Sequence, residues 1–329
     1  MLEDPGFDKA ELAAELRAGW GAEASDLVFV PGYDMRAASY DVAAGDGRYF
    51  LKVRLEPPRL GPLEVPRALL DAGVTDVLAP IPTVASSLWH PMADGRSLVL
   101  YPFVAGRNAM VAGLPEAGWR AFGTAMRAVH DSGLHQRFAD SLPAETFSLP
   151  SAAIVRDVLT QQPAVLSPAA SRLHAFLDAH AGRIGAMLER AEELGAQLRR
   201  RTFDHVLCHA DIHAANVLVA ADGRILMVDW DGPMLAPRER DLLFVIGSRI
   251  ARRVEPHEEA WFFVGYGEVE VDHEAIVYYR CERILEDIGE AGRSVYADHA
   301  VPETSRAAEV DMVESFFAPG ADVETVERR

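Results

Sequence analysis

The chain of 329 residues contains little of what several common classes of protein require. Its two cysteines, Cys208 and Cys281, provide neither a disulfide framework nor a four-ligand zinc site. Basic side chains are scarce, because 32 lysines and arginines stand against 50 aspartates and glutamates, for a net charge of −18. Binding a nucleic-acid backbone needs a basic face, so we expect no nucleic-acid partner.

Long apolar runs and a targeting signal are also missing. An apolar run such as LLFVI at 242–246 is far too short to cross a bilayer, so we expect no membrane partner. The first residues, MLEDPGFDKAELAAEL, are acidic and amphipathic and lack the basic and apolar regions of a signal peptide. These absences predict a soluble, cytoplasmic protein. Hydrophobic residues make up 49% of the chain, which is enough for a large buried core.

The expected secondary structure changes in character along the chain. Runs bounded by turn residues predict five strands, at 26–30, 37–43, 48–54, 86–90 and 97–104. Helical periodicity predicts helices at 8–19, 62–73, 115–133 and over most of 151–200. A β-rich interruption follows at 203–230, and the rest is helical again. We therefore expect an α+β fold of two lobes, a strand-rich one over 1–102 and a mainly helical one over 103–329.

The segment HADIHAANVLVAADGRILMVDWD, at 209–231, concentrates polar side chains between apolar runs. His209, Asp211, His213 and Asn216 fall within eight residues, and Asp229 ends the next apolar run. A hairpin closed by Ala-Asp-Gly would bring Asp229 beside Asn216 and Asp211. A carboxylate and an amide oxygen suit Mg²⁺, and a second carboxylate can accept a proton from a hydroxyl.

Two other interpretations of this segment stay open. The H-x-D-x-H pattern of His209, Asp211 and His213 also offers nitrogen and oxygen ligands to a metal, although no third histidine follows at ligand spacing. Asp211 could also be a plain turn residue, because aspartate is common in turns.

HADIHAANVL resembles the catalytic loop of the aminoglycoside phosphotransferase family, H-G-D-x-x-x-x-N, which an aspartate follows downstream. The resemblance implies a two-lobed protein-kinase-like fold and ATP-dependent phosphoryl transfer to a hydroxyl, with Mg²⁺. It makes Asp211 the catalytic base and Asn216 and Asp229 the metal ligands, while His209 braces the loop. Ala210 departs from the family, which usually has glycine there.

The resemblance extends to the nucleotide. It implies that Lys52, in the strand RYFLKVR, holds the α- and β-phosphates, with Glu64 as its ion-pair partner and Glu56 as the alternative.

Residues 31–42 stand where a loop should cover the phosphates, although they lack G-x-G-x-x-G. LVLYPFVAG at 98–106 resembles the hinge that receives adenine, which places Tyr101 and Phe103 at the cofactor.

Two further segments, 228–247 and 278–290, resemble the spectinomycin phosphotransferase branch of that family. From residue 255 onward, 19 acidic residues stand against 6 basic ones, with aromatic residues among them. Acidic and aromatic side chains attract a cationic ring system, although amphipathic helices with solvated acidic faces would give the same composition. We expect Asp231, Tyr278, Glu282 and Asp287 to contact the substrate, a small cationic antibiotic for which spectinomycin is the first choice.

Three alternative functions stay open. The chain could phosphorylate another aminoglycoside or a nucleoside antibiotic, or it could be a bacterial protein Ser/Thr kinase of the same fold. It could also bind a nucleotide without catalysis, although the retention of Asp211, Asn216 and Asp229 argues against this. The sequence does not distinguish ATP from GTP or a monomer from a dimer.

Overall fold

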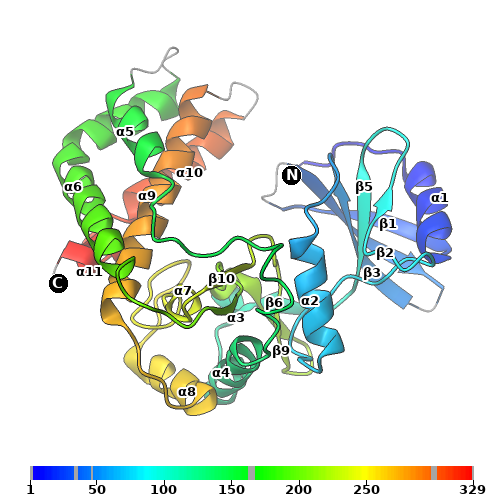
Figure 1. Cartoon of the computed structure of the whole chain (residues 1–329). Helices are drawn as coiled ribbons and strands as arrows, with labels where there is room; N and C mark the ends of the chain where they lie inside the picture. The colour runs from blue at the N-terminus through cyan, green and yellow to red at the C-terminus, as the bar shows by residue number, and fades with distance from the viewer. Residues whose placement is uncertain (1–2, 33–35, 46, 162–166, 298–301, 328–329) are drawn as a thin grey trace. The chain divides into compact units, whose positions relative to one another are not determined.

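The computed structural model describes residues 3–32, 36–45, 47–161, 167–297 and 302–327 (Figure 1). By its internal contacts the chain divides into two units. Unit 1 comprises Met1–Pro143, Val206–Leu235 and Ala260–Gly267, and unit 2 comprises Ala144–His205, Ala236–Glu259 and Glu268–Arg329. The lobe boundary after residue 102 stays a prediction, because unit 1 combines segments of both expected lobes.

Unit 1 holds most of the strands. Its elements in chain order are α1 (Lys9–Trp20), β1 (Ala24–Val30), β2 (Ala37–Ala44), β3 (Gly47–Arg54), α2 (Gly61–Asp71), β4 (His90–Pro91), β5 (Ser97–Pro102), β6 (Gly106–Asn108), α3 (Ala109–Ala112), α4 (Glu116–His130), β7 (Val206–Cys208), the 3₁₀ helix η1 (Ala214–Asn216), β8 (Val217–Ala220) and β9 (Ile225–Met227). Two elements have residues in both units, β10 (Met234–Ala236) and α8 (Pro256–Tyr266).

The first sheet of unit 1 is antiparallel, with strand order β1-β2-β3-β5-β4. Side chains alternate between its two faces. Leu51 and Val53 of β3 face a hydrophobic core that also contains Leu12 and Leu16 of α1. Lys52, one residue out of phase with them, therefore lies on the opposite face. The alternation within one strand thus delivers a charged side chain to the face away from the core.

The second sheet has the strand order β6-β8-β9. β8 and β9 form the expected hairpin, with Val217 opposite Met227 and Val219 opposite Ile225. The pairing continues beyond β9, because the Val228 N–H donates to the Asn216 carbonyl at 3.0 Å. This register confirms the prediction that the end of the second run returns to the start of the first.

The strand expected over 86–90 is wrong in most of its length, since β4 comprises only His90–Pro91. Side chains bind the backbone there instead. The Ser87 N–H donates to Thr83 Oγ1 at 3.0 Å, and Ser87 Oγ donates to the Trp89 carbonyl at 2.8 Å. Such local bonds compete with the pairing of a strand.

Unit 2 is helical. Its elements are α5 (Ala152–Thr160), α6 (Pro168–Leu198), α7 (Glu239–Leu242), α9 (His273–Ala297), α10 (Glu303–Ser315) and α11 (Asp322–Glu327). The long helices α6 and α9 pack together and share one hydrophobic core with α5, α10 and α11 (Figure 1). None of the helices in the described ranges combines the length and the apolar composition that crossing a bilayer demands.

Two glycines of α6 have opposite surroundings. A Cβ added at Gly195 would lie 2.5 Å from the Phe147 carbonyl oxygen and 3.1 Å from a ring carbon of Tyr278. A Cβ added at Gly185 would have nothing within 4 Å. Gly195 is therefore required by the close approach of the backbone near Phe147, whereas Gly185 only weakens the helix.

Alanine at these two positions should change the free energy of unfolding in opposite directions. Gly195→Ala forces the backbone apart and should lower it by about 1–3 kcal/mol. Gly185→Ala removes the entropic disadvantage of glycine and should raise it by about 0.5–1 kcal/mol. Urea unfolding followed by circular dichroism measures both, and equal effects would contradict this packing of α6.

Two acidic side chains of α9 are largely buried and lie against arginines. Asp287 accepts from Arg283 Nε at 3.1 Å, and Glu282 pairs with Arg240 of α7. Burial raises the pKa of Asp287 to about 6, although Arg283 opposes the shift. Burial also raises the pKa of Glu282, against the opposing charge of Arg240. Asp287 is ionised at neutral pH, and because its charge is largely buried it lowers the stability of unit 2.

Asp287→Asn should consequently stabilise the protein at pH 7.5 but not at pH 4. The folded-state pKa of about 6 lies above the ordinary value of 3.8. The contribution of Asp287 to the free energy of unfolding is therefore most favourable below pH 4, where the carboxyl is protonated, and it is lost as the pH rises through 6. The shift corresponds to roughly 2–3 kcal/mol at about 1.4 kcal/mol per pKa unit. Urea unfolding of variant and wild type at both pH values measures the difference.

Glu327→Gln is the control of opposite sign in the same unit. The hydrogen bond from Arg183 lowers the pKa of Glu327, so its contribution to stability is present at neutral pH and is lost in acid. Glu327→Gln should therefore destabilise the protein at pH 7.5 and converge with the wild type at low pH. Parallel pH profiles for the two variants would refute both assignments.

Candidate active site

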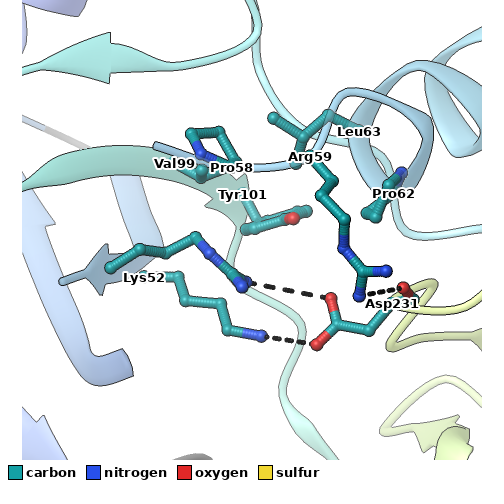
Figure 2. Close-up of a pocket in the computed structure, with 9 residues that line it drawn as sticks. Lys52, Pro58, Arg59, Pro62, Leu63, Val99, Tyr101 and Asp231 are labelled. Carbon is teal, nitrogen blue, oxygen red and sulfur yellow. Dashed lines mark hydrogen bonds and ion pairs between the residues drawn. The ribbon is translucent and has the colours of Figure 1, made fainter. Parts of the chain in front are cut away.

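The predicted lysine and the predicted metal ligand lie together in unit 1. Lys52 Nζ lies 3.9 Å from Asp229 Oδ1 and 3.3 Å from Asp231 Oδ2. β3 delivers the lysine, and the chain leaving β9 delivers both carboxylates. Figure 2 shows Lys52 and Asp231 pointing toward each other. The contacts with Asp229 and Asp231 join two segments that are far apart in the sequence.

Asp229 has an unusual backbone and an unusual acidity. Its φ is 62°, in the left-handed region that non-glycine residues rarely adopt. Partial burial raises the pKa of Asp229; Lys52 opposes the shift, and the neighbouring Asp231 and Asp211 carboxylates add to it. A carboxylate crowded by two others is a favourable position for a cation.

The loop after β7 is fixed by its backbone. His209 is fully buried, and its Nε2–H donates to the Val228 carbonyl at 2.9 Å. Its Nδ1 accepts from the Asp211 N–H at 3.4 Å, so the ring is the Nε2-protonated tautomer. Asn216 Nδ2 donates to the Asp211 carbonyl at 2.8 Å. His209 and Asn216 thus hold the backbone of Asp211 from both sides, while the Asp211 side chain is 38% exposed.

Ala210 adopts φ 70°, so the position where the family usually has glycine does require the left-handed region. The alanine is accommodated there without displacing Asp211 or Asn216 from their hydrogen bonds.

The two histidines of the loop are used in hydrogen bonds, which disfavours the H-x-D-x-H metal site. Both ring nitrogens of His209 have backbone partners. His213 Nδ1 accepts from the Ala215 N–H at 3.2 Å, and its Nε2 lies 3.7 Å from Asp211 Oδ1. His209 therefore has no ring nitrogen to offer a metal.

Asn216 and Asp229 fit a hard cation. The bond between Val228 and Asn216 brings residues 216 and 229 to neighbouring positions at the open end of the hairpin. The two side chains supply an amide oxygen and a carboxylate, which are ligands that Mg²⁺ prefers.

A pocket adjoins Lys52. It is lined by Lys52, Arg54, Pro58, Arg59, Pro62, Leu63, Val99, Tyr101 and Asp231. Figure 2 shows Lys52 and Arg59 reaching Asp231 from different sides of the view. Sequence reasoning missed Arg54 and Arg59. The signal for Arg54 was its position two residues after Lys52, on the same face of β3. Arg59 lies in a loop and had no comparable signal.

The two hinge residues have different surroundings. Tyr101 lines the pocket, and burial raises the pKa of its hydroxyl. The Phe103 N–H donates to the Arg48 carbonyl at 3.2 Å, and the Arg48 guanidinium lies 3.7 Å above the Phe103 ring. Contact of either residue with adenine stays a prediction.

The expected partner of Lys52 also stays a prediction. Glu64 lies in the first turn of α2. Glu56 pairs with Arg36 at 3.0 Å. Of the loop at 31–42, residues 33–35 lie outside the described ranges.

The other residues expected at the substrate lie on α9 of unit 2. Tyr278 is fully buried and its hydroxyl accepts from the Leu149 N–H at 3.2 Å. Glu282 and Asp287 form the ion pairs with Arg240 and Arg283 described above. These contacts lie within unit 2, and a role in binding substrate stays a prediction.

Comparisons with known proteins identify the family of the chain. A model described as the phosphotransferase enzyme family matches residues 32–276. A search of curated proteins finds no match. The spectinomycin phosphotransferase APH(9)-Ia, solved with ADP and spectinomycin, is similar at 28% identity and a TM-score of 0.88, with 98% of each chain covered.

Two more distant structures share the fold. The amicoumacin kinase hAmiN with AMP-PNP and Ca²⁺ is 16% identical, with a TM-score of 0.64 and coverage of 98% of this chain and 94% of that one. An aminoglycoside phosphotransferase, APH(4)-Ia, with AMP-PNP and hygromycin B is 15% identical, with a TM-score of 0.62 and coverage of 97% and 98%.

The predicted α+β, two-lobed, protein-kinase-like fold is thereby confirmed. The family match spans more than half of the chain and contains Lys52, Asp211, Asn216 and Asp229. The chain is therefore a phosphotransferase and belongs to the phosphotransferase enzyme family.

Proposed function

We propose that the chain transfers the γ-phosphoryl group of ATP to a hydroxyl of a small cationic antibiotic, with spectinomycin as the first candidate, and that it acts in the cytoplasm. The observation that carries the proposal is the exposed Asp211 carboxylate, whose backbone is held by His209 and Asn216. The similarity to a spectinomycin phosphotransferase over 98% of both chains supports the choice of substrate.

The chemistry needs positioning more than covalent participation, because the transition state of phosphoryl transfer is largely dissociative. Lys52 holds the α- and β-phosphate oxygens as a cation on a rigid strand. Asn216 and Asp229 hold Mg²⁺, which neutralises charge on the phosphates. Asp211 orients the acceptor hydroxyl and takes its proton late in the transfer.

The phosphoryl acceptor can be one of several kinds of molecule. We propose that the antibiotic contacts Asp231, Tyr278, Glu282 and Asp287, because acidic and aromatic groups attract a cation. A different aminoglycoside or a nucleoside antibiotic would use the same transfer chemistry. A protein kinase would use it as well, but would act on a protein hydroxyl.

Release of ADP in a coupled assay with Mg-ATP should rise when spectinomycin is added. The assay should include a panel of aminoglycosides, nucleoside antibiotics and a generic protein substrate. Stimulation by another small compound would identify that compound as the substrate in place of spectinomycin, and the proposed phosphoryl transfer would stand. Stimulation by the protein alone would replace antibiotic transfer by protein phosphorylation.

Asp211→Asn should lower kcat by about 10²–10⁴-fold, the usual contribution of a positioned proton acceptor. The matched control is Asp222→Asn, which removes the same charge at the β8–β9 turn, where Asp222 pairs with Arg224 at 2.7 Å. The control should keep wild-type turnover. Near-normal turnover of Asp211→Asn would eliminate Asp211 as the base.

Asn216→Ala should raise the Mg²⁺ concentration for half-maximal rate by about 10-fold or more, because an oxygen ligand is lost. Loss of the hydrogen bond to the Asp211 carbonyl would lower kcat without moving this concentration. A magnesium titration of wild type, Asn216→Ala and Asp222→Asn separates the two effects. An unchanged Mg²⁺ requirement would show that Asn216 supports the loop and does not bind the metal.

A further inference from the structure

Three cationic side chains surround Asp231. Lys52 Nζ lies 3.3 Å from its Oδ2 atom, and Arg54 Nη1 lies 3.9 Å from its Oδ1 atom. Arg59 Nη2 lies 3.5 Å from its backbone carbonyl oxygen. Figure 2 shows these contacts as dashed lines that converge on Asp231. A single residue thus contacts all three cations that line the pocket.

Two cations of this cluster, Lys52 and Arg54, are more buried than the anion, whereas Arg59 is exposed. The side chains of Lys52 and Arg54 are 15% and 19% exposed, whereas Asp231 is 48% exposed. Arg54 Nε is buried and has no hydrogen-bond partner among the described residues. Lys52 and Arg54 are therefore held by the sheet, while the carboxylate is half exposed and can leave the pocket.

The charge in the pocket is not balanced by this carboxylate alone. Lys52, Arg54 and Arg59 supply three positive charges, and among the described residues that line the pocket only Asp231 is acidic. Asp229 adds a longer contact to Lys52 at 3.9 Å. Guanidinium groups bind phosphate oxygens through paired N–H donors, so a second and larger anion is favoured here.

We propose that Asp231 is a resident counter-ion in the phosphate subsite. Its carboxylate pairs with Lys52 and Arg54 when no nucleotide is present, and the phosphates of a nucleoside di- or triphosphate replace it. Arg54 and Arg59 then contact the phosphates together with Lys52. The inference rests on the proposed use of ATP and adds two phosphate-binding arginines and one competing anion to it.

Removing the charge of Asp231, which competes with the phosphates, should strengthen the binding of phosphates and leave the binding of the nucleoside unchanged. Isothermal titration calorimetry in EDTA, without Mg²⁺, measures the affinity for ADP and for adenosine. Asp231→Asn should bind ADP about 5- to 10-fold more tightly, because a negative charge within about 4 Å of the site is gone. Its affinity for adenosine should equal that of the wild type.

Two further variants make the test specific. Asp222→Asn removes a negative charge away from the pocket and should bind ADP as the wild type does. Arg54→Gln removes a proposed phosphate ligand and should weaken ADP binding by about 10-fold. Thermal unfolding of each variant establishes that it is folded.

Unchanged or weaker ADP binding by folded Asp231→Asn would overturn the inference. An equal gain for ADP and adenosine would overturn it as well. A wild-type protein that binds ADP neither in EDTA nor after Mg²⁺ is added would contradict the proposed use of ATP itself. The wild-type titration therefore tests the proposed function, and the difference between variants tests the counter-ion.

Discussion

The peptide groups around Val228 hold the active site together. The Val228 N–H donates to the Asn216 carbonyl, and the Val228 carbonyl accepts from His209. One residue of the chain leaving β9 therefore binds both ends of the loop that carries Asp211. Because Asp229 follows immediately, its carboxylate is placed relative to Asn216 by backbone bonds alone. The backbone arrangement therefore does not depend on which side chain follows Val228.

The hydrogen bonds of Val228 with His209 and Asn216 also explain two residues with a strained backbone. Ala210 and Asp229 have φ values of 70° and 62°, and each is the residue that follows a partner in the His209–Val228 bond. A left-handed conformation costs an L-residue roughly 1–2 kcal/mol. Such strain persists only where surrounding bonds determine the backbone, which is common at functional sites. Glycine at position 210 would relieve it, which accounts for the family preference.

The sequence predicted the parts of this site that depend on short-range pattern. Alternation in β3 placed Lys52 off the core, and two apolar runs around Ala-Asp-Gly defined the β8–β9 hairpin. The pairing of Lys52 with Asp231 joins positions 179 residues apart and has no local signature. The expected strand at 86–90 failed because hydroxyl bonds at Ser87 compete with strand pairing in a way that composition does not reveal.

The acidity of the whole chain makes the cation cluster necessary. A protein with a net charge of −18 repels the phosphates of a nucleotide at long range and attracts a cationic acceptor. Screening limits that repulsion to about 8–10 Å at physiological salt. Inside this distance Lys52 and Arg54 decide the sign of the electrostatic field, because their side chains are largely shielded from solvent. The largely buried cations of the pocket therefore lie on one strand, β3, where Lys52 and Arg54 share a face.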